Sequence, residues 1–380
     1  MQVKILAAFL AFAISFSAQA ASELENLSKK VDALSKEVTM LKMGGSSSWT
    51  DRISLGGYGE MIYTNKRSEN ESGAKVGGTN PQVDALRHVL YVGYKFSDRW
   101  SMLSEIEIEH ADEIYLEFAQ LDYNYSKALN FRAGLLLTPV GIVNQMHEPA
   151  TFVGVKRSDI ESSIIPTTWR EHGLGLYGES HNFEYQVYLM NSLNGDSFSS
   201  SGVRSGRQKG SQATARSLSY VARLDWKKIN WLTLGASAYV GKANSSSKDV
   251  GHNIFDGHAL INYKNLYARA LYVHSTIDAK KLPVSQNVGE KLHGFYVELG
   301  YDVAPSELVV MPYIRREQYN TQDDVPAGVT NSLATKVENT VLGIMVKPLD
   351  NISFKADYTL QENDAKTGVD MFNLGMGWHF

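Results

Sequence analysis

The chain has 380 residues, 43% of them hydrophobic and 21% charged, so it carries enough apolar side chains for a folded protein. The formal net charge of −4 argues against a nucleic-acid binder, and the absence of cysteine excludes disulfides and thiolate metal sites. Beyond the N-terminus no stretch approaches the roughly 20 apolar residues of a membrane-spanning helix, which excludes a helical membrane protein.

Residues 1–20 have the pattern of a secretory signal peptide. Lys4 supplies the positive charge, residues 5–16 form the apolar segment, and Ala18-Gln19-Ala20 is a small-x-small cleavage site. A short N-terminal membrane anchor is the alternative, although the apolar run is shorter than a bilayer requires. We expect an exported protein whose mature chain begins near Ala21.

Residues 21–43 predict a short periplasmic coiled coil. Apolar side chains recur there at spacings of three and four over three heptads, as a coiled-coil seam requires. The seam positions are Leu24, Leu27, Val31, Leu34, Val38 and Leu41. The heptads alone favour a coiled coil of two helices, so the prediction of a trimer comes from the rest of the chain and not from the heptads. A lone helix packed on another surface is the alternative. A Gly/Ser-rich linker follows at 44–52.

From residue 53 to residue 380 the pattern changes to period two, which is typical of β-strands. The clearest case is 352–361, where Phe354 and Tyr358 fall on an apolar face and Lys355 and Asp357 on a polar one. A soluble β-sandwich shows the same alternation, so periodicity alone does not decide the class.

The lengths of the strands and of their connections decide it. We place sixteen candidate strands of about ten residues, the length with which a tilted strand crosses a bilayer. They span 53–65, 85–96, 99–109, 114–125, 129–137, 172–181, 183–192, 217–227, 231–242, 254–263, 265–275, 291–303, 305–319, 336–348, 350–362 and 368–380. Tight turns alternate with longer, Gly/Ser/Asn-rich stretches. The sequence therefore predicts an all-β, 16-stranded antiparallel transmembrane β-barrel of the bacterial outer membrane over 53–380.

The last segment, 368–380, carries the most specific local signal. Its alternate apolar residues end with Trp378 and Phe380 on one face. This pattern resembles the terminal strand of bacterial outer-membrane proteins, which the outer-membrane assembly machinery recognises. We therefore predict that Trp378 and Phe380 belong to an assembly signal.

A barrel of sixteen strands encloses a lumen too wide for side chains to fill, which predicts an aqueous channel unless a segment blocks it. The longest loop, 138–171, is rich in Ile, Val, Pro and aromatic residues that a solvated loop does not need. We expect it to fold into the barrel and narrow the channel; folding over the rim or against a neighbouring protomer is the alternative. The candidate constriction residues are His147, Glu148, Lys156, Arg157, Asp159, Glu161, Arg170 and Glu171.

A second group of charges falls on strand faces that should point into the lumen. An Arg or Lys facing the bilayer midplane costs about 2–4 kcal/mol, so mid-strand charges are expected to face inward. The predicted wall residues are Glu105, Glu107, Glu109, Arg132, Arg223, Arg269, Arg315 and Lys355. Ile106 and Ile108 alternate with the glutamates and are expected to face lipid.

The stretch 131–178 combines several distinctive motifs. They are the "RAG" strand end that begins at Arg132, Pro139-x-Gly141, Glu148-Pro149, and the run "IIPTTW" before "GLGLYG". Together they resemble the phosphate-selective porin O/P-like family, and the coiled coil is similar to that of trimeric porins with periplasmic zippers. The resemblance implies a 16-stranded trimer that passes small anions or organic acids. Family members carry a basic ladder along the pore, whereas the inward charges here have both signs, so phosphate specificity is not carried over.

These features predict a water-filled outer-membrane porin for the passive diffusion of small hydrophilic solutes, with no cofactor or metal. Its partners would be outer-membrane lipid and two further copies in a homotrimer. Lys156, Arg157 and Arg170 favour small anions, although charges of both signs leave the ion preference open. One alternative is an adhesive or structural barrel without an open pore. The other is an outer-membrane enzyme, but the sequence has neither an H-E-x-x-H nor a G-x-S-x-G motif to support it.

Overall fold

The structure is a computed structural model, and it describes residues 49–246, 249–304 and 308–380. The chain divides into two compact units, 1–53 and 54–380. The predicted signal peptide, the coiled-coil seam and the first part of the linker lie outside the described residues. Within the described ranges, no helix is both long and apolar enough to cross a membrane.

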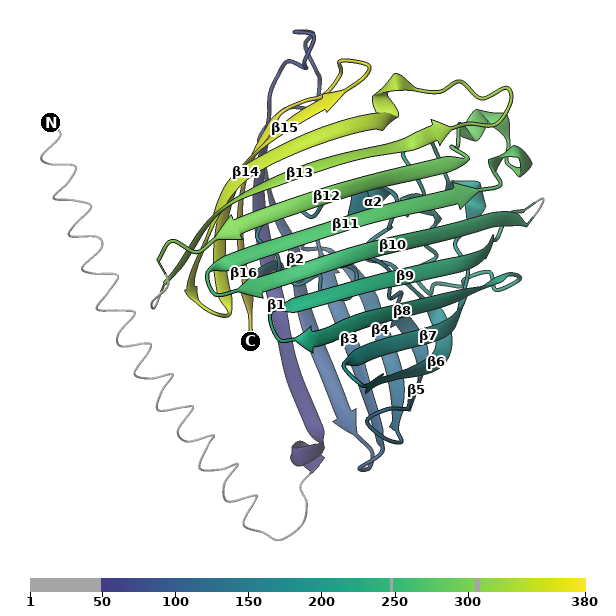
Figure 1. The fold of residues 1–380 in the computed structure, drawn as a ribbon, viewed down its shortest axis with the longest axis vertical. Coiled ribbons are helices and arrows are strands. Elements are labelled where there is room, and N and C mark those ends of the chain that lie inside the picture. The colour runs from purple at the N-terminus through teal and green to yellow at the C-terminus, as the bar shows by residue number, and fades with distance from the viewer. Residues whose placement is uncertain (1–48, 247–248, 305–307) are drawn as a thin grey trace, which may run out of the picture. The chain divides into compact units, whose positions relative to one another are not determined.

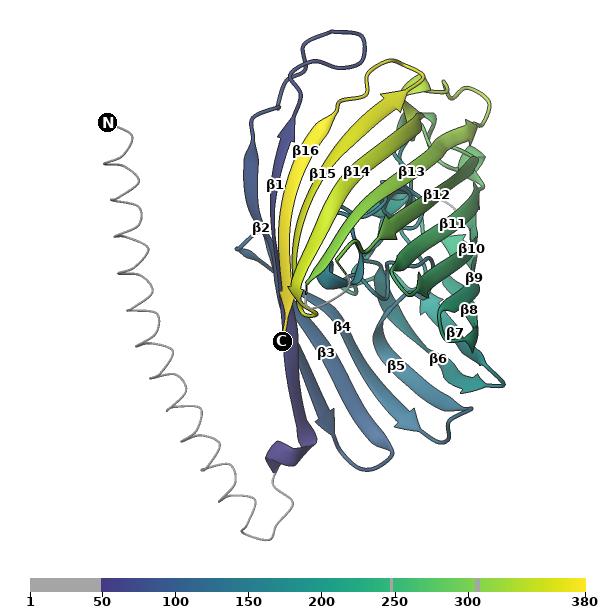
Figure 2. The same ribbon diagram turned by 60° about the vertical axis from the view of Figure 1, so that its left-hand side comes forward.

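The strands form one closed antiparallel barrel in which each strand pairs with its neighbours in sequence and β1 pairs with β16 (Figures 1 and 2). The sixteen strands are β1 (Ile53–Lys66), β2 (Gln82–Lys95), β3 (Trp100–Glu109), β4 (Glu113–Asn124), β5 (Asn130–Leu137), β6 (Arg170–Ser180), β7 (Phe183–Asn191), β8 (Leu218–Ile229), β9 (Leu232–Ala243), β10 (Val250–Tyr263), β11 (Leu266–Ile277), β12 (Lys291–Tyr301), β13 (Val309–Asp324), β14 (Lys336–Leu349), β15 (Ile352–Asn363) and β16 (Met371–His379). The predicted fold class and strand number are therefore confirmed.

The strand bounds differ from the predicted ones by a few residues. The largest difference is at β13, which runs from Val309 to Asp324 instead of over 305–319. The hydrogen-bonded ladder continues there through polar residues, with Lys291 opposite Asp324, where alternation of apolar and polar residues no longer marks a strand. Backbone pairing, which does not depend on side-chain polarity, sets the end of the strand.

The two faces of the strands have opposite chemistry. On β15, Phe354 and Leu360 are 48% and 42% exposed, whereas Lys355 and Asp357 are buried. Apolar side chains therefore point away from the barrel and charged side chains point into it. This is the arrangement of a transmembrane β-barrel, whose outer face meets lipid and whose interior is polar.

The connections at one end are tight turns, such as 181–182 and 230–231. The opposite end carries the long connections, and two of these run inside the ring of strands: 138–169, here called the inner loop, and 192–217 (Figures 1 and 2). The short helices are η1 (Trp49–Arg52), η2 (Pro149–Thr151), α2 (Ile160–Ser163), η3 (Gly195–Ser197), η4 (Arg204–Gly206), η5 (Ala279–Lys281), η6 (Val284–Gln286) and η7 (Leu333–Thr335).

Candidate functional site

The inner loop is held to the barrel wall by the inward cations, beginning with Lys355 on β15. The Lys355 Nζ donates to the carbonyl oxygens of Pro149, Phe152 and Gly154 at 2.5, 2.6 and 2.8 Å. It also lies 4.0 Å from the centre of the Phe152 ring. All three donors of the ammonium group are therefore used, and the charge serves to hold loop backbone that would otherwise lack partners.

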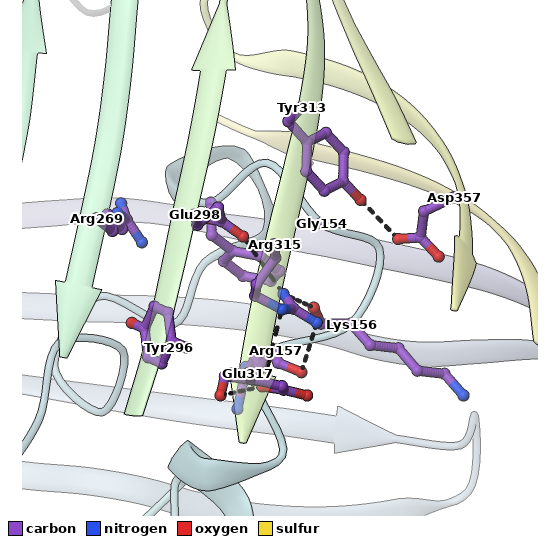
Figure 3. A network of polar contacts seen from close by, with 12 residues as sticks. Gly154, Lys156, Arg157, Arg269, Tyr296, Glu298, Tyr313, Arg315, Glu317 and Asp357 are labelled. Carbon is purple, nitrogen blue, oxygen red and sulfur yellow. Dashed lines mark hydrogen bonds and ion pairs between the residues drawn. The ribbon is translucent and has the colours of Figure 1, made fainter. Parts of the chain in front are cut away.

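Arg315 on β13 holds the next part of the loop (Figure 3). Its guanidinium donates to the Lys156 carbonyl at 3.0 Å and lies between Glu298, at 3.3 Å, and Glu317, at 3.8 Å. Two carboxylates balance this one cation in a buried position, which is how buried charges are accommodated. Arg269 on β11 makes the same kind of contact, donating to the carbonyl of Thr151.

The loop enters the lumen at Gly141, whose peptide groups are bound on both sides. Its N–H donates to Asp256 on β10 at 3.0 Å, and its carbonyl accepts from Arg223 on β8. Gly141 has a φ of +75°, and a Cβ there would lie 2.6 Å from the Glu161 carboxylate. Glycine is therefore required at this entry point, both for the left-handed backbone and for the close carboxylate.

Two acids that the sequence assigned to the constriction face the inner loop and the wall instead of an open passage. Glu161 accepts from the N–H groups of Ile142 and Val143 at 2.6 and 2.7 Å and from the Tyr296 hydroxyl at 2.7 Å. Burial raises the pKa of Glu161, and these donors oppose that shift. Asp159 accepts from the Asn339 amide at 2.9 Å. Burial, and next the charge of Glu317, raise the pKa of Asp159 to about 6.

The two internal connections also bind each other. The Val203 N–H donates to the Ser163 carbonyl at 3.0 Å, and a Cβ at Gly202 would lie 2.2 Å from that same oxygen. Arg207 donates to the carbonyls of Thr167 and Thr168 at 3.1 and 2.9 Å. The stretch 192–217 therefore supports the inner loop at residues 163–168.

A continuous hydrophobic core fills the lumen beside strands β7–β12, a region here called the filled half. Trp169, Ile164 and Val140 of the inner loop pack there against wall residues such as Tyr239, with the two aromatic rings 4.9 Å apart. Trp169 and Ile164 have no exposed surface. The apolar residues that distinguish this loop in the sequence are those that make this core.

Charged side chains dominate the lumen beside strands β1–β4, a region here called the polar half. Arg87 on β2 pairs with Glu60 at 3.0 Å and with Glu107 at 3.6 Å. Arg170, at the start of β6, pairs with Glu117 at 2.7 Å. Glu117 is the extra residue of a β-bulge, because Glu105 and Ile106 pair with Phe118 and Leu116 and skip it. Such bulges redirect side chains, and this one allows Glu117 to reach Arg170.

Four loop cations near this wall form no ion pair with a carboxylate within the described parts of the chain. They are Arg157 of the inner loop and Arg204, Arg207 and Lys209 of the stretch 192–217. Burial, followed by the charges of Arg207 and Arg157, lowers the pKa of Arg204 to about 9, so this side chain still carries its charge at neutral pH. The polar half thus combines paired charges on the wall with loop cations that have no carboxylate partner in the described residues.

Three of those cations were missed by the sequence reasoning, which left 193–216 as an ordinary loop. The signal was the run "RSGRQK", which places Arg204, Arg207 and Lys209 within six residues. A charge run in a Gly/Ser-rich segment is usually solvated, so nothing in the sequence separated this one from an exposed loop.

His147 and Glu105 lie where the polar half meets the inner loop. The His147 Nε2 lies 3.3 Å from Glu105 Oε1, which also accepts from the Tyr58 hydroxyl at 3.1 Å. Its Nδ1 lies 3.0 Å from the Asn144 carbonyl. Burial disfavours the charged imidazole, but the hydrogen bond to Glu105 and its negative charge outweigh this and raise the pKa of His147.

The remaining predicted residues are spread around the lumen. Glu148 accepts from the Tyr91 hydroxyl at 3.2 Å, and Glu171 accepts from the Asn191 amide at 2.7 Å. The Lys156 Nζ lies 3.5 Å from the Met371 sulfur, away from the other loop cations.

Arg132 binds Asp122 at 2.7 Å, and Glu109 is the half-buried last residue of β3. Ile106 and Ile108 point outward and are 40% and 37% exposed. Among the described residues, no group of three or more His, Asp or Glu side chains is arranged to hold a metal ion.

Comparison with known proteins gives one sequence relative and a group of structures with the same fold. No family model matches the chain. A protein of Aquifex aeolicus (strain VF5), described as an uncharacterized protein, is 34% identical over 358 residues, which cover 86% of this chain and 80% of the relative. The chain belongs to the same family as this Aquifex protein. The resemblance to the phosphate-selective porin O/P-like family stays a prediction.

The solved structures share the barrel at low sequence identity. Salmonella typhi OmpF, in complex with daunomycin, has a TM-score of 0.59 at 12% identity, and the outer membrane channel DcaP of Acinetobacter baumannii has 0.59 at 13%. Each match covers 86% of this chain and 97% of the other. OmpT of Vibrio cholerae, expressed in the outer membrane, has a TM-score of 0.55 at 11% identity over the same shares. At this identity the likeness establishes the fold.

Proposed function

We propose that this protein is an outer-membrane porin through which small hydrophilic solutes diffuse along the polar half of the lumen. The observation that carries the proposal is the division of the lumen, with a hydrophobic core beside β7–β12 and charged side chains beside β1–β4. Burying charged side chains costs desolvation free energy. A barrel that served only as a closed scaffold would have no need of them. Rings of charged side chains are instead how porins select solutes.

The proposed preference is for small anions. Arg157, Arg204, Arg207 and Lys209 have no carboxylate partner in the described ranges, and those of their hydrogen bonds that reach the inner loop end on neutral oxygens. The wall acids Glu60, Glu107 and Glu117 are each paired with an arginine. Paired charges largely cancel, so the unpaired loop cations dominate the potential that a solute meets. This replaces the sequence-based choice of Lys156, Arg157 and Arg170, because Lys156 points elsewhere and Arg170 is paired.

We further propose that the signal peptide directs export and that the coiled coil of residues 21–43 joins three barrels. The heptad seam supports the zipper, and the apolar outer surface near the closing pair β1 and β16, which includes Met61, Leu374 and Met376, offers a surface for a second copy. Deletion of 22–43 should weaken the oligomer on native gels without unfolding the barrel. An unaltered oligomer would reject the zipper.

The test of the channel is single-channel conductance in planar bilayers, with reversal potentials measured across a salt gradient. Stepwise conductance with anion preference is expected for the purified protein. The triple variant Arg157→Gln, Arg204→Gln, Arg207→Gln should lose that preference, whereas Arg67→Gln, in an exposed ion pair with Asp370, should retain it. Folded protein without conductance would overturn the porin proposal.

A further inference from the structure

A cavity of about 460 Å³ lies beneath the loop cations, toward the end of the barrel that carries the tight turns. The first residues of β1, near Ser54, form its outer edge, and His147 of the inner loop forms its inner boundary. Strands β2–β5 contribute the side walls. A solute that passes the constriction would enter this cavity next.

Two glutamates, Glu105 and Glu148, line the cavity together with Arg132 and His147. Glu105 is fully buried, and its Oε1 takes both the Tyr58 hydroxyl and the contact with His147. The second oxygen, Oε2, has no hydrogen-bond partner within the described residues. Glu148 also lines the cavity and accepts one hydrogen bond, from Tyr91. That oxygen is itself buried, and leaving it unpaired is costly. A donor in the cavity satisfies it once the Glu105 side chain turns toward the open space.

The one arginine on the cavity is already neutralised. Arg132 binds both oxygens of Asp122, at 2.7 and 3.4 Å, and donates to the Tyr188 hydroxyl at 3.3 Å. Its guanidinium lies 4.3 Å from the centre of the Tyr177 ring. Asp122 therefore balances the charge of Arg132, and three of its five N–H groups are engaged.

Aromatic and aliphatic side chains complete the lining. The Tyr91 and Phe118 rings lie 6.2 Å apart on neighbouring walls, and Leu103 and Leu136 add apolar surface. Aromatic faces attract ammonium groups, and the attraction is stronger at sites that exclude water. Carboxylates beside aromatic rings form a site for a cation with an apolar body.

We propose that this cavity is a binding site for an organic ammonium ion, with its nitrogen at Glu105 and Glu148 and its apolar part against the exposed surface of Tyr91 and Phe118. The site needs only the folded barrel; its place on a solute path rests on the proposed porin function. The loop cations above it repel such an ion, so the amine reaches the site from the tight-turn end.

Equilibrium binding to the detergent-solubilised full chain tests the site, with 2-phenylethylamine as the probe and 2-phenylethanol as its uncharged match. Titration calorimetry should give at least tenfold tighter binding of the amine. Glu105→Gln and Glu148→Gln should each weaken amine binding about tenfold, a loss typical of a charge-assisted contact. Asp112→Asn, at an exposed turn, should leave it unchanged.

Glu148 is the more informative variant because it lies on the loop and is only half-buried, so its replacement does not disturb the barrel wall. Phe118→Leu keeps both charges and removes one ring, and it should weaken binding severalfold. Equal binding of amine and alcohol, or full amine binding by Glu148→Gln, would overturn the proposal.

Ion current separates the site from the channel. Phenylethylamine added at the tight-turn side should interrupt the single-channel current, and the interruptions should be absent in Glu148→Gln. Selective amine binding by a protein that never conducts would refute the porin and leave the site standing. Normal conductance with no difference between amine and alcohol in the binding assay would refute the site and leave the porin proposal standing.

Discussion

The two halves of the lumen use similar inward charges for opposite purposes. On β8, β11, β13 and β15, Arg223, Arg269, Arg315 and Lys355 each donate to the backbone of the inner loop, and apolar side chains fill the lumen beside β7–β12. Beside β1–β4 the wall charges pair with charges of opposite sign, and the nearby loop cations have no carboxylate partner within the described residues. An inward charge is thus not in itself a pore charge, because it can instead hold a loop in place.

The largest effect on stability should come from removing a buried side chain from the core of the filled half. Trp169→Ala removes a fully buried ring that packs on Tyr239, so it should lower the free energy of unfolding by about 3–5 kcal/mol. Urea titration in lipid vesicles measures this loss, and Trp231→Ala, at a 40% exposed turn position, serves as the control. Equal, small losses for both variants would mean that the core beside β7–β12 is not tightly packed.

The next effect should come from Lys355→Met, which leaves three loop carbonyls without their donor. A charge-assisted hydrogen bond contributes about 1.5–3 kcal/mol, so the inner loop should loosen while the strands stay paired. Single-channel conductance should rise and become noisier, and a protease should cut the loop. Lys228→Met, at an exposed position near the end of β8, is the matched control. Identical conductance in the two variants would mean that Lys355 does not hold the loop in place.

A smaller effect should follow from one change of sign in the polar half. Arg204→Glu places a carboxylate among the loop cations, so the anion preference should fall severalfold while stability changes little. The reversal potential measures the preference, and Arg216→Glu, an exposed position on the same connection, is the control. An unchanged reversal potential would place the solute path elsewhere in the lumen.

The smallest effect should be a pH step at His147. Its raised pKa means that the charged imidazole pairs with Glu105 at low pH, and that this stabilisation is lost as pH rises through a value above the ordinary 6.5. The passage then loses one positive charge, so anion preference should fall, by roughly twofold given screening by salt. His147→Gln should remove the step in reversal potential against pH. A step that persists in this variant would assign the titration to another group.

The strands could be predicted because period-two alternation is a local property, and it also placed Glu105, Arg223, Arg315 and Lys355 on the inner face. Their partners could not be predicted. The groups that bind Lys355 are carbonyl oxygens of Pro149, Phe152 and Gly154, and every residue has such an oxygen, so the sequence carries no sign of them.

The same holds for the polar half. The β-bulge that turns Glu117 toward Arg170 depends on the register between β3 and β4, which alternation within one strand does not reveal. The apolar content of the inner loop did predict its burial. The cations of 192–217 gave no such signal, because their approach to the lumen depends on Gly202 and Val203 packing against Ser163.

The terminal strand links the wall to the constriction through two glycines. On β16 the outward residues Leu374 and Met376 alternate with Gly375 and Gly377, and a Cβ at Gly377 would lie 2.5 Å from the Pro149 ring. β16 therefore completes the surface on which a segment more than 200 residues earlier in the chain rests. The order of assembly follows from this geometry: Pro149 has its place on the wall only once β16 is paired, so closing the barrel and positioning the inner loop are coupled.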